Sequence, residues 1–208
     1  MDEIRSPSAE FSGARESGRA AWRAARNFED LCLLGAAFLE RRCAHFPGWG
    51  SPDPDEETDA IRDALVALHS RGFLSVASQP GFEGTLDGHV IRQRAFVAGF
   101  ARPALARSFV RADRIAVRAW FPDGSFACGS MGVDGVALHE PEAMTCVDGV
   151  ARVVSGHDAR EAELALFADE LGEAALRELA ASAYVTAWDP EFGRARFLWD
   201  EMLHLGAH

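Results

Sequence analysis

The sequence predicts an α/β fold, in which a single mixed β-sheet is flanked by helices. Amphipathic helical patterns stand before and after the apolar strands, and short hairpins carry Asp-Gly turns. The strand at residues 73–77 is followed by a segment of helical character and then by a strand at residues 114–121. This order favours a right-handed parallel crossover. The predicted sheet therefore combines a parallel crossover with antiparallel hairpins, and α+β is the alternative class.

The chain is expected to form one domain. Residues 1–16 are polar and are predicted to be a flexible N-terminal arm, which leaves residues 17–208 as a single α/β domain. Asn27 is expected to cap a helix that runs to about residue 42. Residues 45–57 form a predicted loop.

Later elements follow from periodicity and from turn residues. An amphipathic helix over residues 57–71 is expected to end at Gly72. Residues 89–100 are predicted to be a helix, and Pro103 is expected to open another. The remaining predictions are a hairpin at residues 114–129, small strands within 133–154, helices at 159–171 and 173–181, a strand at 182–188 and a helix at 194–205.

Composition excludes several function classes. The net charge is −11, and the cationic residues are spread along the chain, so no basic stripe for nucleic acid exists. All 21 cationic residues are arginine, which excludes Schiff-base chemistry and the phosphate-loop lysine. No apolar stretch could span a bilayer, and no secretory signal is seen. The expected location is the cytoplasm, without nucleic-acid or membrane partners.

Motifs for metals, cofactors and activated nucleophiles are absent. Cys43 and His45 are followed by nothing with ligand spacing, and His-Glu-x-x-His does not occur. Gly-x-Gly-x-x-Gly and Gly-x-Ser-x-Gly are also missing. We therefore expect no metal and no cofactor.

The first candidate site is the loop after residues 73–77, together with the segment that follows it. Ligands of open α/β sheets bind beyond the carboxyl ends of strands. Arg94 could hold a carboxylate or phosphate, and Gln79 could bind an amide or a base edge. The alternative is a structural turn shaped by Pro80 and Gly81. The predicted ligand-binding residues of this segment are Ser78, Gln79, Gln93 and Arg94, and its predicted acid–base residues are Glu83 and His89.

The second candidate site spans residues 189–194, after the last predicted strand. Asp189 would be a carboxylate for acid–base catalysis, and Arg194 would contact an anion. If the two strands are parallel neighbours, both loops would share one rim and could share a pocket. The alternative is that Asp189 caps the turn and that Phe192 belongs to the core.

Several short motifs together resemble a known family. They are Trp-x-x-Ala-Arg at residues 22–26, Pro-Gly-Trp at 47–49, Ser-Gln-Pro-Gly at 78–81, Gln-Arg-Ala at 93–95 and Asp-Pro-Glu-Phe-Gly-Arg at 189–194. The chain resembles a family of uncharacterised proteins found mainly in streptomycetes and related actinobacteria. Relatives often carry tryptophan where Phe192 stands here. The resemblance implies a cytoplasmic bacterial protein and adds no mechanism.

Three functional hypotheses follow. The first is a small-molecule-binding domain, which could act as a transferase or hydrolase independent of metal and lysine on an anionic or carboxylate metabolite. The alternative is an acidic protein-interaction module, such as an immunity or regulatory protein, supported by the acidic run at residues 53–59. The third is a homodimer that buries exposed aromatic residues such as Phe46 and Trp49.

Overall fold

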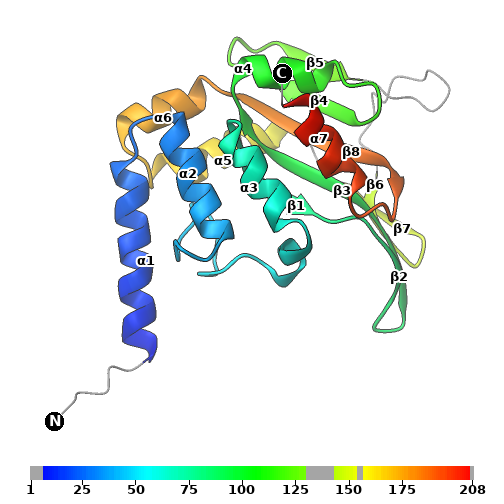
Figure 1. Ribbon diagram of the computed structural model, residues 1–208, viewed down its shortest axis with the longest axis horizontal. Coiled ribbons are helices and arrows are strands. Elements are labelled where there is room, and N and C mark those ends of the chain that lie inside the picture. The colour runs from blue at the N-terminus through cyan, green and yellow to red at the C-terminus, as the bar shows by residue number, and fades with distance from the viewer. Residues whose placement is uncertain (1–6, 130–142, 154–156, 207–208) are drawn as a thin grey trace.

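The computed structural model describes residues 7–129, 143–153 and 157–206 (Figure 1). An eight-stranded sheet forms its centre. The helices are α1 (Pro7–Ala24), α2 (Phe28–Leu39), α3 (Arg62–Ser70), α4 (Pro103–Val110), α5 (His157–Ala168), α6 (Glu173–Ala180) and α7 (Phe197–Leu205), with a 3-10 turn, η1, at Glu56–Ala60. The strands are β1 (Phe73–Gln79), β2 (Phe82–Leu86), β3 (His89–Ala101), β4 (Ala116–Trp120), β5 (Phe126–Gly129), β6 (Ala143–Val147), β7 (Val150–Val153) and β8 (Ala183–Phe192).

The predicted parallel crossover is wrong, because every described strand pair is antiparallel. The sheet runs β5-β4-β8-β3-β6-β7, and β1 and β2 also pair with β3. The long strand β3 thus joins the two halves of the sheet. Its C-terminal part lies between β1 and β8, and its N-terminal part lies between β2 and β6. An antiparallel sheet with covering helices corresponds to the α+β alternative.

The predicted crossover depended on a helix at residues 89–100. These residues form strand β3 instead. Residues 95–101 are all buried, because both faces of this part of the sheet are covered. Val97 lies in the core on one face, while Phe96 and Phe100 lie in the core on the other. A strand that is buried on both faces shows no period of two, so its sequence resembles a buried helix.

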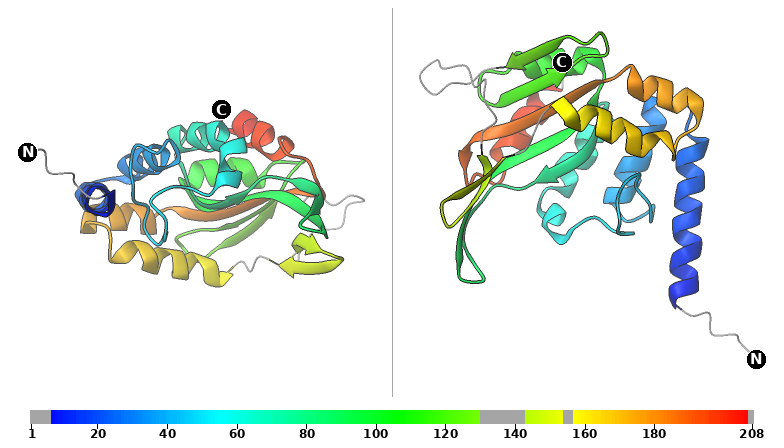
Figure 2. Two further views of the ribbon diagram at one scale, coloured as in Figure 1. Left: turned by 90° about the horizontal axis from the view of Figure 1, so that it is seen from below. Right: turned by 180° about the vertical axis from the view of Figure 1, so that it is seen from behind.

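Helices cover both faces of the sheet (Figure 2). Helices α3, α4 and α7 supply Leu65, Phe109 and Trp199 to one core. Helices α5 and α6 supply Phe167 and Leu179 to the other core, which α2 also joins. Within the described residues, no helix is both long and apolar enough to cross a membrane.

Several local predictions are confirmed. Asn27 caps α2, since its side chain accepts the N–H of Asp30 at 2.9 Å. Gly72 follows α3 with φ of +85°, a conformation that favours glycine. Pro103 opens α4. The N-terminal prediction differs, because residues 7–16 belong to helix α1, which extends away from the rest of the fold (Figure 1).

Candidate functional site

The two loops that the sequence selected as a shared rim lie against each other. A Cβ atom added at Gly81 would lie 2.5 Å from the carbonyl oxygen of Arg194. A Cβ atom added at Gly193 would lie 3.0 Å from the Cβ atom of Glu83. The contact arises because β3 pairs with both β2 and β8 at this end of the sheet. We call this contact the loop junction.

Asp189 and Arg194 form an ion pair at the loop junction. Asp189 is fully buried, and its carboxylate oxygens accept hydrogen bonds from Arg194 Nε at 3.1 and 2.8 Å. One oxygen also accepts the backbone N–H of Glu191 at 2.9 Å. A buried carboxylate is costly unless it is paired and hydrogen-bonded. This arrangement anchors the end of β8, and the acid–base role of Asp189 stays a prediction.

Three further predicted residues brace the strand ends. Gln79 Nε2 donates to the carbonyl oxygen of Arg94 at 3.1 Å. Gln93 Nε2 donates to the carbonyl oxygen of Pro80 at 2.9 Å. Arg94 Nη1 donates to the carbonyl oxygen of Asp189 at 3.3 Å. The structure therefore brings Gln79, Gln93 and Arg94 together, where they donate to main-chain oxygens of the junction, and Gln79 Nε2 also donates to the Thr145 hydroxyl at 3.2 Å.

The remaining acid–base candidates lie in exposed ion pairs. Glu83 Oε1 lies 3.1 Å from Arg92 Nε. His89 Nδ1 lies 2.7 Å from Asp148 Oδ2 near the β2–β3 turn. Because His89 stands four residues before Gln93 on one strand, the two are about 13 Å apart. The structure does not bring His89 to the loop junction.

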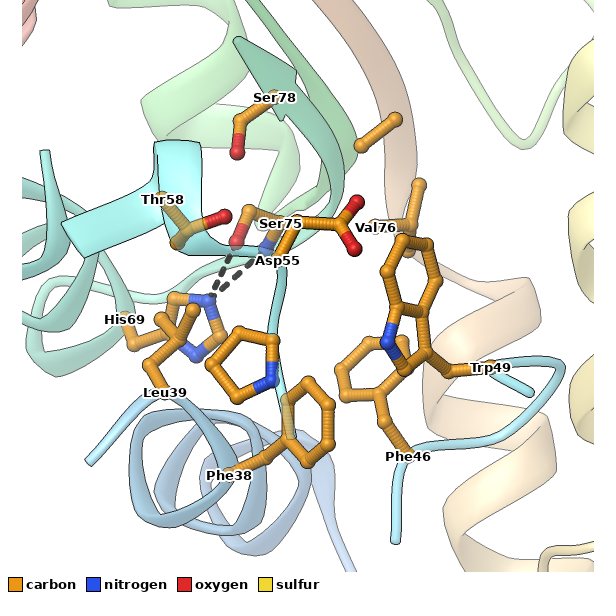
Figure 3. A pocket seen from close by; sticks show the side chains of 12 residues that line it. Phe38, Leu39, Phe46, Trp49, Asp55, Thr58, His69, Ser75, Val76 and Ser78 are labelled. Carbon is orange, nitrogen blue, oxygen red and sulfur yellow. Dashed lines mark hydrogen bonds between the residues drawn. The ribbon is translucent and has the colours of Figure 1, made fainter. Parts of the chain in front are cut away.

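A cavity of about 70 Å³ lies between α2, the loop that follows it and β1 (Figure 3). We call it the α2–β1 pocket. Ser78 is the predicted site residue that lines it. The exposed residues Asp55 and Ala77 mark its mouth. The lining comprises Phe38, Leu39, Phe46, Trp49, Pro54, Asp55, Thr58, His69, Ser75, Val76, Ala77 and Ser78.

One wall of the pocket is aromatic. The ring centres of Phe38 and Phe46 are 5.4 Å apart. Trp49 is placed by a tight turn, in which its N–H donates to the carbonyl oxygen of Phe46 at 3.0 Å. Gly48 has φ of +76° in this turn, as the third position of a type II turn requires. Trp49 Nε1 then donates to the carbonyl oxygen of Asp53 at 3.1 Å, which orients the indole.

The opposite wall is polar. Thr58 is 8% exposed, its hydroxyl points into the cavity (Figure 3), and within the described chain that hydroxyl has no hydrogen-bond partner. Ser75 Oγ lies 2.8 Å from His69 Nε2, which also accepts the Ser75 N–H at 3.1 Å. His69 Nδ1 therefore carries the proton and donates to the carbonyl oxygen of Cys32 at 3.0 Å. Burial lowers the pKa of His69 to about 4, so the ring is neutral near pH 7.

The mouth of the pocket is acidic. Asp55 precedes η1, and its carbonyl oxygen accepts the N–H of Thr58 at 3.0 Å. Desolvation, and then the nearby Asp55 carboxylate, raise the pKa of Glu57 above its usual value, while a hydrogen bond from Gln93 acts in the opposite direction. This hydrogen bond places the acidic mouth beside the loop junction. Among the described residues, no group of three or more His, Cys, Asp or Glu side chains could hold a metal ion.

Comparison with known families gives one match that spans most of the chain. The model of a domain of unknown function, DUF6919, matches residues 17–207. This chain is a member of the DUF6919 family. The match includes the loop junction and the whole α2–β1 pocket.

A partial likeness to one curated protein is also found. A stretch of 95 residues is 26% identical to methylenetetrahydrofolate reductase 1 of Schizosaccharomyces pombe, covering 41% of this chain. The match covers 16% of the length of that reductase. An identity this low over so small a share does not place this DUF6919 member in the reductase family.

Sequence reasoning missed most of the pocket in this DUF6919 domain. Phe46 and Trp49 were interpreted as exposed interface residues, yet Phe46 is 7% exposed and Trp49 is partly buried. The Pro47-Gly48 pair was the available signal, because it is typical of a type II turn that can aim the next side chain. No sequence pattern indicated that Thr58 and His69 line a pocket, because their contact with β1 depends on tertiary packing.

Proposed function

We propose that this DUF6919 domain binds a small molecule in the α2–β1 pocket. The observation that carries the proposal is the pairing of an aromatic wall with the hydroxyl of Thr58, which faces the cavity without a hydrogen-bond partner among the described residues. Binding sites are typically lined by apolar and aromatic side chains with few well-placed polar groups. A ligand in the cavity could form a hydrogen bond with this hydroxyl, which would add to the affinity gained from the aromatic wall.

The sequence suggested a small-molecule site at the two loops. We keep that function and assign the site to the α2–β1 pocket instead. Ser78 belongs both to the original set and to the pocket lining. Asp189 and Arg194 bind each other at the loop junction, so they support that junction beside the pocket. An anionic ligand and an acid–base role for Asp189 remain predictions of the sequence.

Blocking the mouth tests the proposal. Ala77 is exposed at the mouth, so Ala77→Phe should place a ring across the opening at little cost in stability. We expect compounds from a fragment library to raise the melting temperature of the wild type and not that of the variant. Thr85→Phe is the control, because it adds a ring to an exposed strand position outside the pocket. Equal binding by wild type and Ala77→Phe would contradict the proposal.

The alternative, a protein-interaction module, is favoured by a different observation. The arm formed by β2, His89–Gln93, β6 and β7 carries exposed apolar side chains, among them Leu86 at 56% and Val150 at 63% exposure. Strand register places both on the face that also holds Ile91 and Val147. Exposed apolar patches of this kind are typical of protein contacts.

The sequence also predicts an actinobacterial origin and a cytoplasmic location. The absence of lysine supports a source with strong codon bias. The four cysteines are free thiols in the described structure, as is usual in a reducing compartment.

A further inference from the structure

We propose that the ligand of the α2–β1 pocket is an organic cation, whose ammonium head group is held by the aromatic wall and by Asp55. This inference rests on the proposed function and names the ligand class. It differs from the anionic ligand expected from the sequence, because the arginines behind that expectation are absent from the pocket lining.

The aromatic wall has the composition of a cation site. Phe38, Phe46 and Trp49 contribute three rings from the end of α2 and the turn after it (Figure 3). The face of an aromatic ring is negative, and indole attracts cations most strongly. The three rings are fixed before a ligand arrives. The type II turn and the hydrogen bond to Asp53 hold Trp49, and Phe46 packs edge-on against Trp22 at 5.2 Å.

The charge among the residues that line the cavity has one sign. The lining includes no arginine, and His69 is neutral because burial disfavours its charged form. Asp55 supplies a carboxylate on the cavity side of η1 (Figure 3), and none of the described ion pairs includes it. Glu57 adds a second carboxyl group close to Asp55. An anion would meet repulsion here, whereas a cation would be attracted.

The size of the cavity indicates which part of the ligand enters. A volume of about 70 Å³ holds a few non-hydrogen atoms, as in a methylated ammonium group. The hydroxyl of Thr58 offers a hydrogen-bond partner to a neighbouring polar group of the ligand. The rest of the molecule would leave through the mouth between Asp55 and Ala77.

Calorimetric titration with choline tests the inference on the full chain. Its uncharged analogue, with carbon in place of the ammonium nitrogen, has nearly the same shape and serves as the matched probe. We expect choline to bind at least about tenfold more tightly than this analogue. Trp49→Leu should weaken choline binding by about tenfold and lower the melting temperature modestly, because it removes the hydrogen bond to Asp53. Asp55→Asn should weaken choline binding by about threefold with thermal unfolding nearly unchanged.

Two control variants test separately the contributions of the Asp55 charge and the Trp49 ring to choline binding. Glu56→Gln removes an exposed carboxylate of the same segment outside the lining, and it should leave choline binding unchanged. Trp49→Phe keeps a ring and should retain more affinity than Trp49→Leu. Equal binding of choline and its analogue, or unchanged binding in Asp55→Asn and Trp49→Leu, would overturn the inference. No choline binding, with fragments still blocked by Ala77→Phe, would overturn it and leave the proposed function standing.

Discussion

His69 is a buried base that carries no counter-charge. Its ring contacts the Cys32 carbonyl oxygen and Ser75, and burial lowers its pKa from 6.5 to about 4. The ring packs so closely on α2 that a Cβ atom added at Gly35 would lie 2.4 Å from His69 Cε1. This histidine therefore ties α2, α3 and β1 together as the floor of the pocket.

Acid should destabilise the fold through His69. Between pH 6.5 and 4 the unfolded chain binds a proton at this residue and the folded chain does not, so stability falls as pH falls through this range. The loss should reach about 3 kcal/mol at pH 4 and then level off. Urea unfolding of the wild type across this range measures it.

Comparing the wild type with His69→Gln tests whether His69 causes the loss of stability at low pH. That variant should show a flatter dependence of its unfolding free energy on pH, while Thr85→Gln, at an exposed position without a titrating group, should follow the wild type. Identical pH dependence in wild type and His69→Gln would show that other groups cause the acid sensitivity.

At the scale of elements, the loop junction depends on one close approach. A Cβ atom at Gly81 would meet the backbone of Arg194 at 2.5 Å, and backbone cannot move aside cheaply. We expect Gly81→Ala to lower the free energy of unfolding by about 1–3 kcal/mol. Chemical denaturation should show this loss. Gly50→Ala, where nothing lies within 4 Å, should change stability by less than about 0.5 kcal/mol. Similar values for both variants would refute this account of the junction.

The elements that the sequence predicted correctly have local causes. Asn27, Gly72 and Pro103 act through capping and turn chemistry that involves near neighbours. Strand β3 could not be recognised in the same way, because its burial depends on β8 and on helices from distant parts of the chain. Strand β2 was not predicted, although the Asp87-Gly88 pair is a sequence signal for a hairpin turn. In the structure both residues have positive φ, as such a turn requires.

The candidate site was also predicted only in part: the contact between the two loops was expected, and the pocket was not. The two loops meet, but the two strands are not the neighbours that were expected: β1 and β8 each pair antiparallel with β3, so they run in the same direction on either side of it and end at the same edge. The pocket was not found, because residues 38–78 converge on it through helix, loop and strand without a shared motif. The positions of Arg94 and Arg194 near strand ends suggested an anion site, but in the folded chain Arg94 contacts a main-chain oxygen and Arg194 contacts a carboxylate.

At the scale of the whole molecule, the exposed arm predicts self-association at high concentration. Leu86 and Val150 lie on one apolar face, so replacing both with serine should keep the chain monomeric where the wild type dimerises. Sedimentation velocity across a concentration series would measure this. Leu33→Ser is the control, because Leu33 is 68% exposed on α2, outside the arm. A wild type that stays monomeric would rule out dimerisation through the arm.

The place of β3 at the centre of the sheet also has a consequence for how the protein is made. Strand β8 begins at residue 183, more than eighty positions after β3 ends, so a growing chain on the ribosome leaves one hydrogen-bonding edge of β3 unpaired until late in synthesis. Contacts between such distant segments slow folding and leave strand edges open to aggregation. Chaperone binding to the nascent chain would therefore matter most before β8 emerges.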